Sequence, residues 1–597
     1  MRMHSPTLLR LTPFALGLLL FGCNSATSNS SLGDDPVGTV ESGNSETHES
    51  TEDTTYSEDD VVDITLSGAA IAVEDSGADQ VSVSGTVATI VASGTYRVTG
   101  TLSDGQLLVN APDGGLVQII LNGANITSLS GAPIFVQEAE KTILILADGT
   151  ANVLADQDGY VLADGEDEPN APLFSKDDLS IYGGTEGTGT LTVYANYKDG
   201  IVSKDGLVIA NARITVVSEN DDGIRGKDYL VIRDSVIDID ADGDALRSTN
   251  DGDDALGYIE IDGGTYNLTA GADGIQAVTD VVIKGGNFDI TTGGGAGASL
   301  ASSDSAKALK AGVYLVVSGG TFLINAADDA LHSNVALAVT GGDFAISTGD
   351  DALHAEAELT VQDGFVDIAT CYEGLEAASI TVAGGDVRIV SSDDALNVAA
   401  GEDSSGGTIA AQSLDIEGGY IYAEAGGDGL DSNSEIVMSG GTVIVNGPTD
   451  SGNGAIDYDR TFEMSGGFLV AAGSSGMAEA PSTSSGQASL EITYGTSSGG
   501  GGRPGGGSSG STMAAGTLIR IESSDGAELL TFAPKKAWQS VVFSAPSLTD
   551  GLTGKILTGG TATGESLDGL YSDATYSGGT ERTSFTVSTV VNQVSFQ

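Results

Sequence analysis

The sequence predicts an all-β protein: a right-handed parallel β-helix with about 22 residues per coil, followed by a small C-terminal β region. Three observations carry this prediction. An acidic motif recurs at a most frequent spacing of 22 residues, Gly-Gly pairs keep the same spacing, and short runs of alternating apolar residues lie between these markers.

The acidic motif consists of Asp or Glu, then Gly or Ala, then Ile or Leu. Its first residues, which we call the acidic column, are Asp199, Asp222, Asp244, Asp273, Asp329, Asp351, Glu373, Asp394 and Asp428. Lys307 opens a degenerate copy in the long interval between Asp273 and Asp329. Equivalent residues of stacked coils lie about 4.8 Å apart, so we expect the acids to form a continuous row.

The segments between the motifs have the pattern of strands. Residues 337–348 (LAVTGGDFAIST) and 380–392 (ITVAGGDVRIVSS) each hold two alternating apolar runs around a Gly turn. No segment shows a helical period with caps. A TIM barrel would need helices, and a propeller would need a longer repeat.

The chain divides into regions of distinct composition. Residues 1–23 have the plan of a secretory signal, with two arginines, an apolar run and then Leu20-Phe21-Gly22-Cys23. This ending resembles a bacterial lipoprotein cleavage box, which implies lipidation of Cys23; the alternative is an ordinary signal peptide cut nearby. Asn24, in place of Asp, favours the outer membrane or cell surface, so the membrane contact expected is an N-terminal lipid anchor.

The remaining regions are assigned by composition and repeat. We expect a disordered acidic tether at 24–60, the first coils and their cap at 61–198, acidic coils at 199–472, a flexible Ser/Gly-rich linker or insertion at 473–514, and the C-terminal β region at 515–597.

The charge excludes one class of partner. Acids outnumber bases 84 to 23, giving a net charge of −61, so nucleic acid would be repelled. Divalent cations, or ligands bridged by them, are the partners that this balance favours, and we expect a monomer. An acidic surface suited to solubility would also explain the total charge, although not the placement of the acids.

Calcium is the predicted cofactor. Stacked carboxylates repel one another unless something neutralises them, and Ca²⁺ takes six to eight oxygen ligands in flexible geometry. The candidate ligands are the acidic column together with the acids that precede four of its members, Asp221, Asp328, Asp350 and Asp393. The alternative is that Asp only serves the turns, where it accepts bonds from local backbone N–H groups.

The residue three positions after each column residue points outward, because the apolar residue beside it faces the core. These positions form a polar stripe, from which we select as candidate ligand-binding residues Arg225, Arg247, His332, His354, Glu376 and Asn397. His332 and His354 are neighbours in the stripe and could hold a metal; the alternative is a solvated or sugar-contacting surface.

Several strings, including FSKDDLSIYGG from Phe174, NDDGIRGKDYLVI from Asn220 and GDDALHAEAELTV from Gly349, resemble a bacterial family of secreted carbohydrate-binding β-helix proteins built like pectate lyases. The resemblance runs from about Val61 to about Gly473 and includes 515–597. It implies calcium-dependent binding of plant-type polysaccharide, with acidic pectic polymers and cellulose as ligand classes, and no established catalysis. Cys371, where Ser is expected, and Lys307 depart from the family pattern.

Two other functions stay open. A calcium-dependent lyase acting on a pectate-like polymer would need a cation and a neighbouring base, for which Lys204, Arg225, Lys227 and Lys310 are candidates. A structural surface spacer is the other alternative. The single Trp and the scattered Tyr and Phe argue against aromatic stacking as the main binding mode and favour an acidic polymer bridged by calcium.

Overall fold

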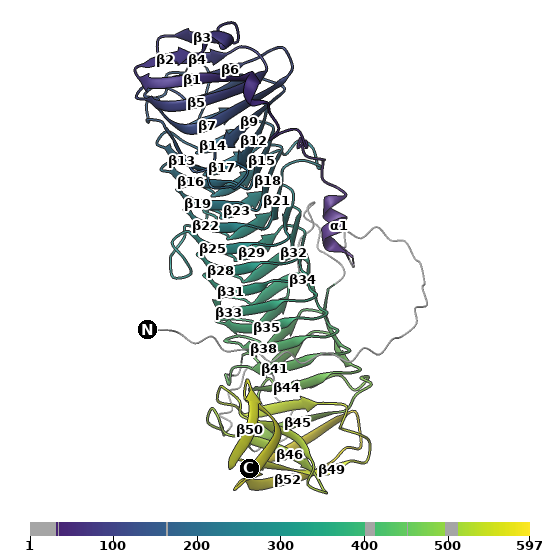
Figure 1. Ribbon diagram of the computed structural model, residues 1–597. Coiled ribbons are helices and arrows are strands. Elements are labelled where there is room, and N and C mark those ends of the chain that lie inside the picture. Colours follow the sequence, from purple (N-terminus) through teal and green to yellow (C-terminus); the bar gives the residue numbers. More distant parts are fainter. Residues whose placement is uncertain (1–31, 34, 163–164, 400–411, 451, 496–510) are drawn as a thin grey trace. The chain divides into compact units, whose positions relative to one another are not determined.

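The computed structural model describes residues 32–33, 35–162, 165–399, 412–450, 452–495 and 511–597. The predicted signal segment and the lipidation site Cys23 lie outside these residues. The described chain from Leu32 onward forms one compact unit. The predicted parallel β-helix is confirmed, since almost every regular element is a strand paired in parallel with the equivalent strand of the next coil (Figure 1). Within the described residues no helix has the length and hydropathy of a membrane span.

Each coil contributes one strand to each of three parallel sheets. In one coil the chain runs from β14 (Ile201–Ser203) in sheet 1, through β15 (Gly206–Ala210) in sheet 2, to β16 (Arg213–Ser218) in sheet 3. It then turns a corner at 219–223 and enters β17 (Ile224–Gly226) of the next coil. The residues of the acidic column lie at this corner, between sheets 3 and 1.

Sheet 1 contains the short strands that follow the acidic motif and their predecessors: β4 (Val87–Ile90), β6 (Gln106–Asn110), β8 (Ile134–Glu138), β11 (Leu173–Ser175), β14, β17, β20 (Leu246–Ser248), β23 (Ile275–Ala277), β26 (Leu309–Ala311), β29 (Leu331–Ser333), the first parts of β32 (Leu353–Val361) and β34 (Leu375–Val382), β36 (Leu396–Val398), β39 (Leu430–Ser432) and β42 (Ile456–Tyr458).

Sheet 2 contains β9 (Lys141–Leu146), β12 (Asp178–Gly183), β15, β18 (Tyr229–Arg233), β21 (Tyr258–Asp262), β24 (Val281–Ile283), β27 (Tyr314–Val317), β30 (Ala336–Val339), the second parts of β32 and β34, β37 (Ser413–Ile416), β40 (Glu435–Met438) and β43 (Thr461–Met464).

Sheet 3 contains β10 (Ala151–Ala155), β13 (Thr190–Ala195), β16, β19 (Val236–Ala241), β22 (Thr265–Ala270), β25 (Asn287–Thr292), β28 (Thr321–Ala326), β31 (Asp343–Thr348), β33 (Phe365–Cys371), β35 (Asp386–Ser391), β38 (Tyr420–Glu424), β41 (Thr442–Asn446) and β44 (Phe468–Gly473).

The first coils differ from the rest because their strands are long and partly antiparallel. The strands β1 (Val61–Gly68), β5 (Gly94–Leu102) and β7 (Leu116–Thr127) run across sheets 2 and 3. β1 pairs antiparallel with β2 (Ala70–Val73), and β3 (Val81–Ser84) pairs antiparallel with β4. Two 3₁₀ turns, η1 (Glu58–Asp60) and η2 (Asp75–Gly77), flank them. The antiparallel hairpins pair strands at the open end of the coils and so limit its exposed edge.

The core is a stack of like side chains from successive coils. Tyr266, Phe288, Phe322 and Phe344 occupy equivalent positions in β22, β25, β28 and β31, and their rings are parallel, with centroids 4.5–4.6 Å apart. Each coil therefore buries its apolar residues mainly against the coils directly before and after it, as in other repeat folds.

The recurring Gly pairs are explained by the turn between sheets 2 and 3. The second residue of the pair has positive φ, for example 106° at Gly342, a conformation that other residues rarely adopt. A Cβ at Gly342 would also lie 3.1 Å from the Phe344 ring. The spacing of the pairs thus follows from one turn repeated in every coil.

The segment 32–60 differs from the disordered tether expected from its composition. Its short helix α1 (Pro36–Glu41), capped by Asp35, places Leu32 and Val40 against the outer face of sheet 2 at Val282 and Val316. We call the whole segment 32–60 the strap. After α1 it continues along sheet 2 (Figure 1).

Polar contacts hold the strap at several coils. His48 hydrogen-bonds to Tyr229 Oη and to Ser180 Oγ, at 2.7 and 2.8 Å. Asp53 pairs with Lys141 at 2.6 Å. Composition alone does not predict the strap, because its few apolar and polar contacts are made with residues far along the chain.

The C-terminal region packs on the last coils. β48 (Ser540–Ser544) pairs antiparallel with β44 and with β45 (Ser489–Tyr494), and β53 (Val591–Phe596) joins β45. A second, antiparallel sheet has the order β50 (Thr561–Leu567), β51 (Leu570–Ser577), β47 (Glu528–Phe532), β46 (Ile519–Ser523), β49 (Thr553–Thr558) and β52 (Thr580–Thr586). Trp538 is fully buried in the shared core and therefore offers no surface for a ligand.

Candidate cation-binding column

The acidic column is present as a row of buried side chains. Its residues precede strands of sheet 1 that pair in register, as Leu331 does with Leu353 and Leu353 with Leu375. Asp199 is fully buried, and even Asp428, near the other end of the row, is only 9% exposed. Burial of so many carboxylates is costly unless each one is paired or hydrogen-bonded.

A hydrogen-bond ladder supplies the first partner. One carboxylate oxygen accepts the backbone N–H of the equivalent residue in the next coil: Asp244 N–H donates to Asp222 Oδ1 at 3.0 Å, and Asp273 N–H to Asp244 Oδ1 at 2.8 Å. The same bond joins other successive members: Asp222 to Asp199, Lys307 to Asp273, Asp351 to Asp329, Glu373 to Asp351 and Asp428 to Asp394. The predicted turn chemistry therefore operates between coils rather than within one.

The ladder is interrupted at two steps. Lys307 has no carboxylate, and Asp329 N–H donates instead to Asp328 Oδ1 at 3.0 Å. Glu373 is one methylene longer than Asp, and its carboxylate accepts the side-chain amide of Asn397 at 2.7 Å. Between Glu373 and Asp394 the described residues form no ladder bond.

The second carboxylate oxygen is paired from the outward stripe in the first half of the column. Arg225 contacts Asp199, and Arg247 contacts Asp222 Oδ2 at 3.0 Å. Burial nevertheless raises the pKa of Asp199 to about 7, against the lowering effect of the Arg225 charge. The predicted basic residues of the stripe therefore neutralise the column.

The middle of the column contains its own cations. Lys310 Nζ lies 2.9 Å from Asp273 Oδ2, and Lys307 Nζ lies 2.7 Å from both Asp328 Oδ1 and Asp329 Oδ2. His332 Nδ1 lies 2.8 Å from Asp329 Oδ2. Burial alone would raise the pKa of Asp329, but the His332 hydrogen bond and the Lys307 charge hold it well below its usual range.

The two predicted neighbours of the stripe, His332 and His354, are brought together, with ring centroids 4.9 Å apart. His354 Nδ1 lies 3.3 Å from Asp351 Oδ2 and 3.6 Å from Glu376 Oε2. Burial disfavours the imidazolium, yet the hydrogen bond to Asp351 and the neighbouring carboxylates raise the pKa of His354. Burial and the contact with Asp351 raise the pKa of Glu376. The raised pKa values of His354 and Glu376 favour their protonated forms, which compete with binding of a metal ion at these two side chains.

The last part of the column holds carboxylates and, among the described residues, no paired Lys, Arg or His. Carboxylate oxygens of Asp394, Asp428 and Asp431 lie within 4.8 Å of one another. Burial, followed by the neighbouring carboxylates, raises the pKa of Asp431 to about 7; burial also raises the pKa of Asp428 to about 6 and that of Glu373 to about 7.

One side-chain oxygen at this end of the column has no hydrogen-bond partner among the described residues. Asn397 lies in register between Glu376 and Asp431 and is 9% exposed. Its Nδ2 donates to Glu373, whereas its Oδ1 has no hydrogen-bond partner among the described residues. Carboxylates and an amide oxygen are the ligand types that Ca²⁺ takes, so the residues present fit calcium. We call Asp394, Asp428, Asp431 and Asn397 the acidic end.

The corner acids that precede the column residues are more exposed. Asp221 groups with Asp199 and Asp222, and Asp328 with Asp329 and Asp350. Burial and the charge of Asp351 raise the pKa of Asp350 to about 6. Asp393 lies at the equivalent corner before Asp394 and is half-buried.

Sequence reasoning missed one further acid. Asp457 pairs in register with Asp431 and continues the stripe. It was missed because Gly454 stands where the other coils have the acid of the motif. The Ala455-Ile456 pair that follows Gly454 matches the rest of the motif and could have identified this coil. Gly454 N–H still donates to Asp428, so the ladder includes this coil.

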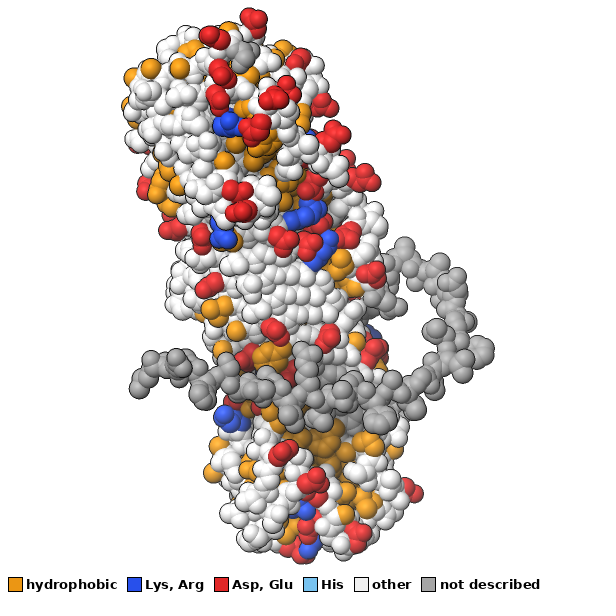
Figure 2. Space-filling model, viewed as in Figure 1, with side chains coloured by type: hydrophobic (Ala, Val, Ile, Leu, Met, Phe, Trp, Pro, Cys, Tyr) orange, Lys and Arg blue, Asp and Glu red, His pale blue; other side chains and the backbone are white. Residues whose placement is uncertain are grey.

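The candidate lyase bases are engaged in ion pairs. Lys204 pairs with Glu168 and Arg225 with Asp199, while the half-exposed Lys227 lies 3.8 Å from Asp228. More generally, acidic side chains are spread over the face shown in Figure 2, and Lys and Arg are few.

Part of the chain is similar to known proteins. Residues 84–352 match the family model described as carbohydrate-binding domain-containing protein, which confirms the predicted resemblance over that segment. A carbohydrate-binding domain-containing protein of Acetivibrio thermocellus is 37% identical over 137 residues, 23% of this chain and 46% of that relative's length. A solved structure of a polysaccharide lyase-like protein from C. thermocellum, a gadolinium derivative, is 35% identical, with a TM-score of 0.37, covering 39% of this chain and 92% of the other. The segment that matches the family model ends before the acidic end begins.

Proposed function

We propose, from the match to carbohydrate-binding domain-containing proteins, that this chain is a non-catalytic, calcium-dependent binding protein for an acidic polysaccharide. In this proposal it acts as a monomer held at the outer membrane or cell surface through a lipid on Cys23. The observation that carries the calcium site is the acidic end, where three carboxylates cluster and where Asn397, in register with Asp431, has an Oδ1 without a hydrogen-bond partner among the described residues.

Bound Ca²⁺ would supply positive charge and coordination positions that sugar carboxylates could share. The chain's own residues would do the rest. Asp394, Asp428 and Asp431 would hold the ion, and Asn397 would contribute its amide oxygen while its Nδ2 keeps Glu373 in place. The side chains of Arg225 and Arg247 are 23% and 35% exposed although each forms an ion pair. They would contact further uronate groups along the stripe.

The test uses the chain from residue 24 onward mixed with polygalacturonate, first with calcium and then with excess chelator. We expect co-sedimentation that requires calcium and no new absorbance from unsaturated sugar ends. Replacing Asp428→Asn and Asp431→Asn together should abolish co-sedimentation. The matched control replaces two exposed acids of sheet 3, Asp289→Asn and Asp367→Asn, and should bind normally.

Other outcomes point to the alternatives. Rising absorbance would make the protein a lyase, and Lys204, Arg225 and Lys227 would then be replaced one at a time. Full folding with neither binding nor absorbance would leave the column as a structural element of a surface spacer, and the ligand assignment would be wrong.

A further inference from the structure

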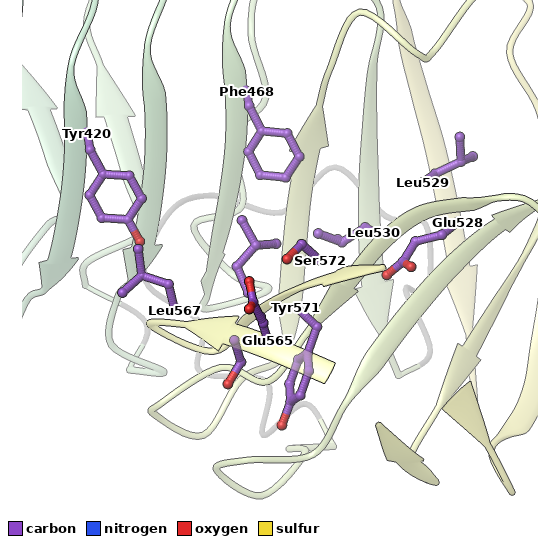
Figure 3. Close-up of a pocket in the computed structure, with 11 residues that line it drawn as sticks. Tyr420, Phe468, Glu528, Leu529, Leu530, Glu565, Leu567, Tyr571 and Ser572 are labelled. Carbon is purple, nitrogen blue, oxygen red and sulfur yellow. The ribbon is translucent and has the colours of Figure 1, made fainter. Parts of the chain in front are cut away.

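The C-terminal region and the last coils line an open cavity of about 680 Å³ (Figure 3). One wall is the outer face of sheet 3, at Tyr420 and Phe468. The opposite wall is the hairpin of β50 and β51, with Leu567 and Tyr571, and β47 supplies Glu528. None of the side chains that line it belongs to the acidic column or to the acidic end.

We propose that this cavity binds neutral hexose rings of a polysaccharide, as a second carbohydrate site that is independent of calcium. This inference goes beyond the acidic-polymer function proposed above. A cavity of this size falls within the range of small-ligand sites, which are mostly apolar with a few placed polar groups.

The aromatic side chains lie in one register. Tyr420 pairs with Thr442, and Thr442 with Phe468, so the two rings stand on the same outward position two coils apart, about 10 Å. Phe365 occupies the same position before Asp386 and is 38% exposed. Aromatic residues that are scattered in the sequence therefore form a discontinuous row along sheet 3, which suits a chain of sugar rings.

The two aromatic rings of the sheet 3 wall, Tyr420 and Phe468, are held in place by contacts within the protein. Tyr420 Oη donates to Asp568 Oδ2 at 2.7 Å, and Arg388, which pairs with the same carboxylate at 2.6 Å, lies 5.2 Å from the Tyr420 ring centroid. The Phe468 ring packs edge-on against Phe543 at 5.6 Å. Because these rings are already held in position, their side chains lose little conformational entropy when a ligand binds.

The hairpin that carries the other wall is fixed at its tip. Asp568 and Gly569 both have positive φ, 51° and 84°, as a tight two-residue turn requires. This turn presents Asp568 to Arg388, and the adjacent Leu567 remains 52% exposed at the cavity.

The charges select the kind of sugar. The cavity is lined by two carboxylates, Glu528 and Glu565, and by no Lys or Arg among the described residues. Arg520 pairs with Glu528 at 2.8 Å from behind, while Glu565 is exposed. A uronate would be repelled by Glu565, whereas neutral hydroxyl groups can donate to it and to the Tyr571 and Ser572 oxygens.

The test is calorimetric titration of the full chain with neutral gluco-, manno- and galacto-hexasaccharides in excess chelator. At least one should bind, and Phe468→Ala and Tyr571→Ala should each weaken it tenfold or more. Tyr571 is on the half-exposed hairpin, so its replacement keeps the test valid if Phe468→Ala does not fold. The matched control is Tyr194→Ala, an exposed ring on β13, which should bind as the unchanged chain does.

The outcome is separable from that of the proposed function. Asp428→Asn with Asp431→Asn should leave neutral-sugar binding unchanged, and galacturonate hexasaccharide should not compete. Absence of binding by all three neutral hexasaccharides, or binding that survives both Phe468→Ala and Tyr571→Ala, would overturn the second site. Loss of neutral-sugar binding on chelation would likewise contradict it.

Discussion

The middle and the end of the acidic column show two ways to bury a row of carboxylates. In the middle, Lys307 occupies a column position and places its ammonium 2.7 Å from Asp328 and Asp329. At the end, Asp394, Asp428 and Asp431 cluster without such a cation in the described chain. The two regions share the same corner and the same backbone ladder. The difference shows that the residue in the column or three positions later, rather than the fold, decides whether a coil supplies its own cation to the buried carboxylates.

The largest effect should come from removing the built-in cation. Lys307→Met leaves Asp329 with His332 at 2.8 Å and His354 at 3.7 Å, and leaves Asp328 without a paired side-chain cation among the described residues. Loss of one partner from a buried ion pair should lower the free energy of unfolding by about 3 kcal/mol. Urea unfolding measures this, and the exposed Lys535→Met serves as the control. Equal midpoints for the two variants would show that Lys307 does not compensate the column.

Calcium should stabilise the other region. At a free concentration one hundred times the dissociation constant, one bound ion adds about 2.7 kcal/mol to the free energy of unfolding. Thermal unfolding with calcium and with chelator measures the difference. The double replacement Asp428→Asn and Asp431→Asn should remove it, whereas Lys307→Met should retain it. A calcium effect that survives the double replacement would place the ion elsewhere.

A cationic side chain introduced at the acidic end should pair with a column carboxylate, as Arg225 and Arg247 do in the first coils. Asp431 has the stripe position that Arg225 and Arg247 have in earlier coils, and Arg247 reaches the carboxylate of the preceding coil. Asp431→Arg should therefore pair with Asp394, raise the calcium-free stability by about 1–2 kcal/mol and abolish the calcium effect. Chelator titration of the melting temperature distinguishes this result from simple loss of a ligand, for which calcium-free stability would not rise.

A further effect should be a pH dependence of the calcium-free protein. The pKa of Asp428 is raised to about 6 and that of Asp431 to about 7, above the value of about 3.9 for an unfolded Asp. Between these limits the folded state binds more protons, so these residues should make stability fall as pH rises from about 4 to about 7 and then level off. The measurement is the free energy of unfolding in chelator as a function of pH, for the unchanged chain minus that for the Asn double variant. The subtraction removes the contribution of Asp329, whose pKa is shifted in the opposite direction and which is present in both proteins. A difference that grows with pH would contradict the raised pKa values.

Much of the coil architecture could be predicted from local sequence. The column, the Gly turns and the outward stripe repeat every 22 residues or so, and in-register stacking converts that period directly into neighbours in space. For the same reason the contact of His332 with His354 was predictable, since they occupy one position in adjacent coils.

What was missed depends on pairs far apart in sequence. Nothing near His48 indicates that it bonds to Tyr229, 181 residues later. Phe468 and Tyr571 share a cavity only because β48 pairs back onto β44. Insertions make the separations of Phe365, Tyr420 and Phe468 look irregular in the sequence, although stacking of the coils aligns these three residues.

The strap also fixes an order of events during synthesis. A ladder bond in the column spans 20 to 35 residues, so a coil can form soon after its predecessor leaves the ribosome. The strap leaves the ribosome first, yet its partners extend from Arg97 to Gln362. It must wait for coils that are made later, and contacts of such high sequence separation form slowly. Docking of the strap therefore marks the time at which the β-helix is complete as far as the coil of Gln362, and until then its residues remain accessible to proteases.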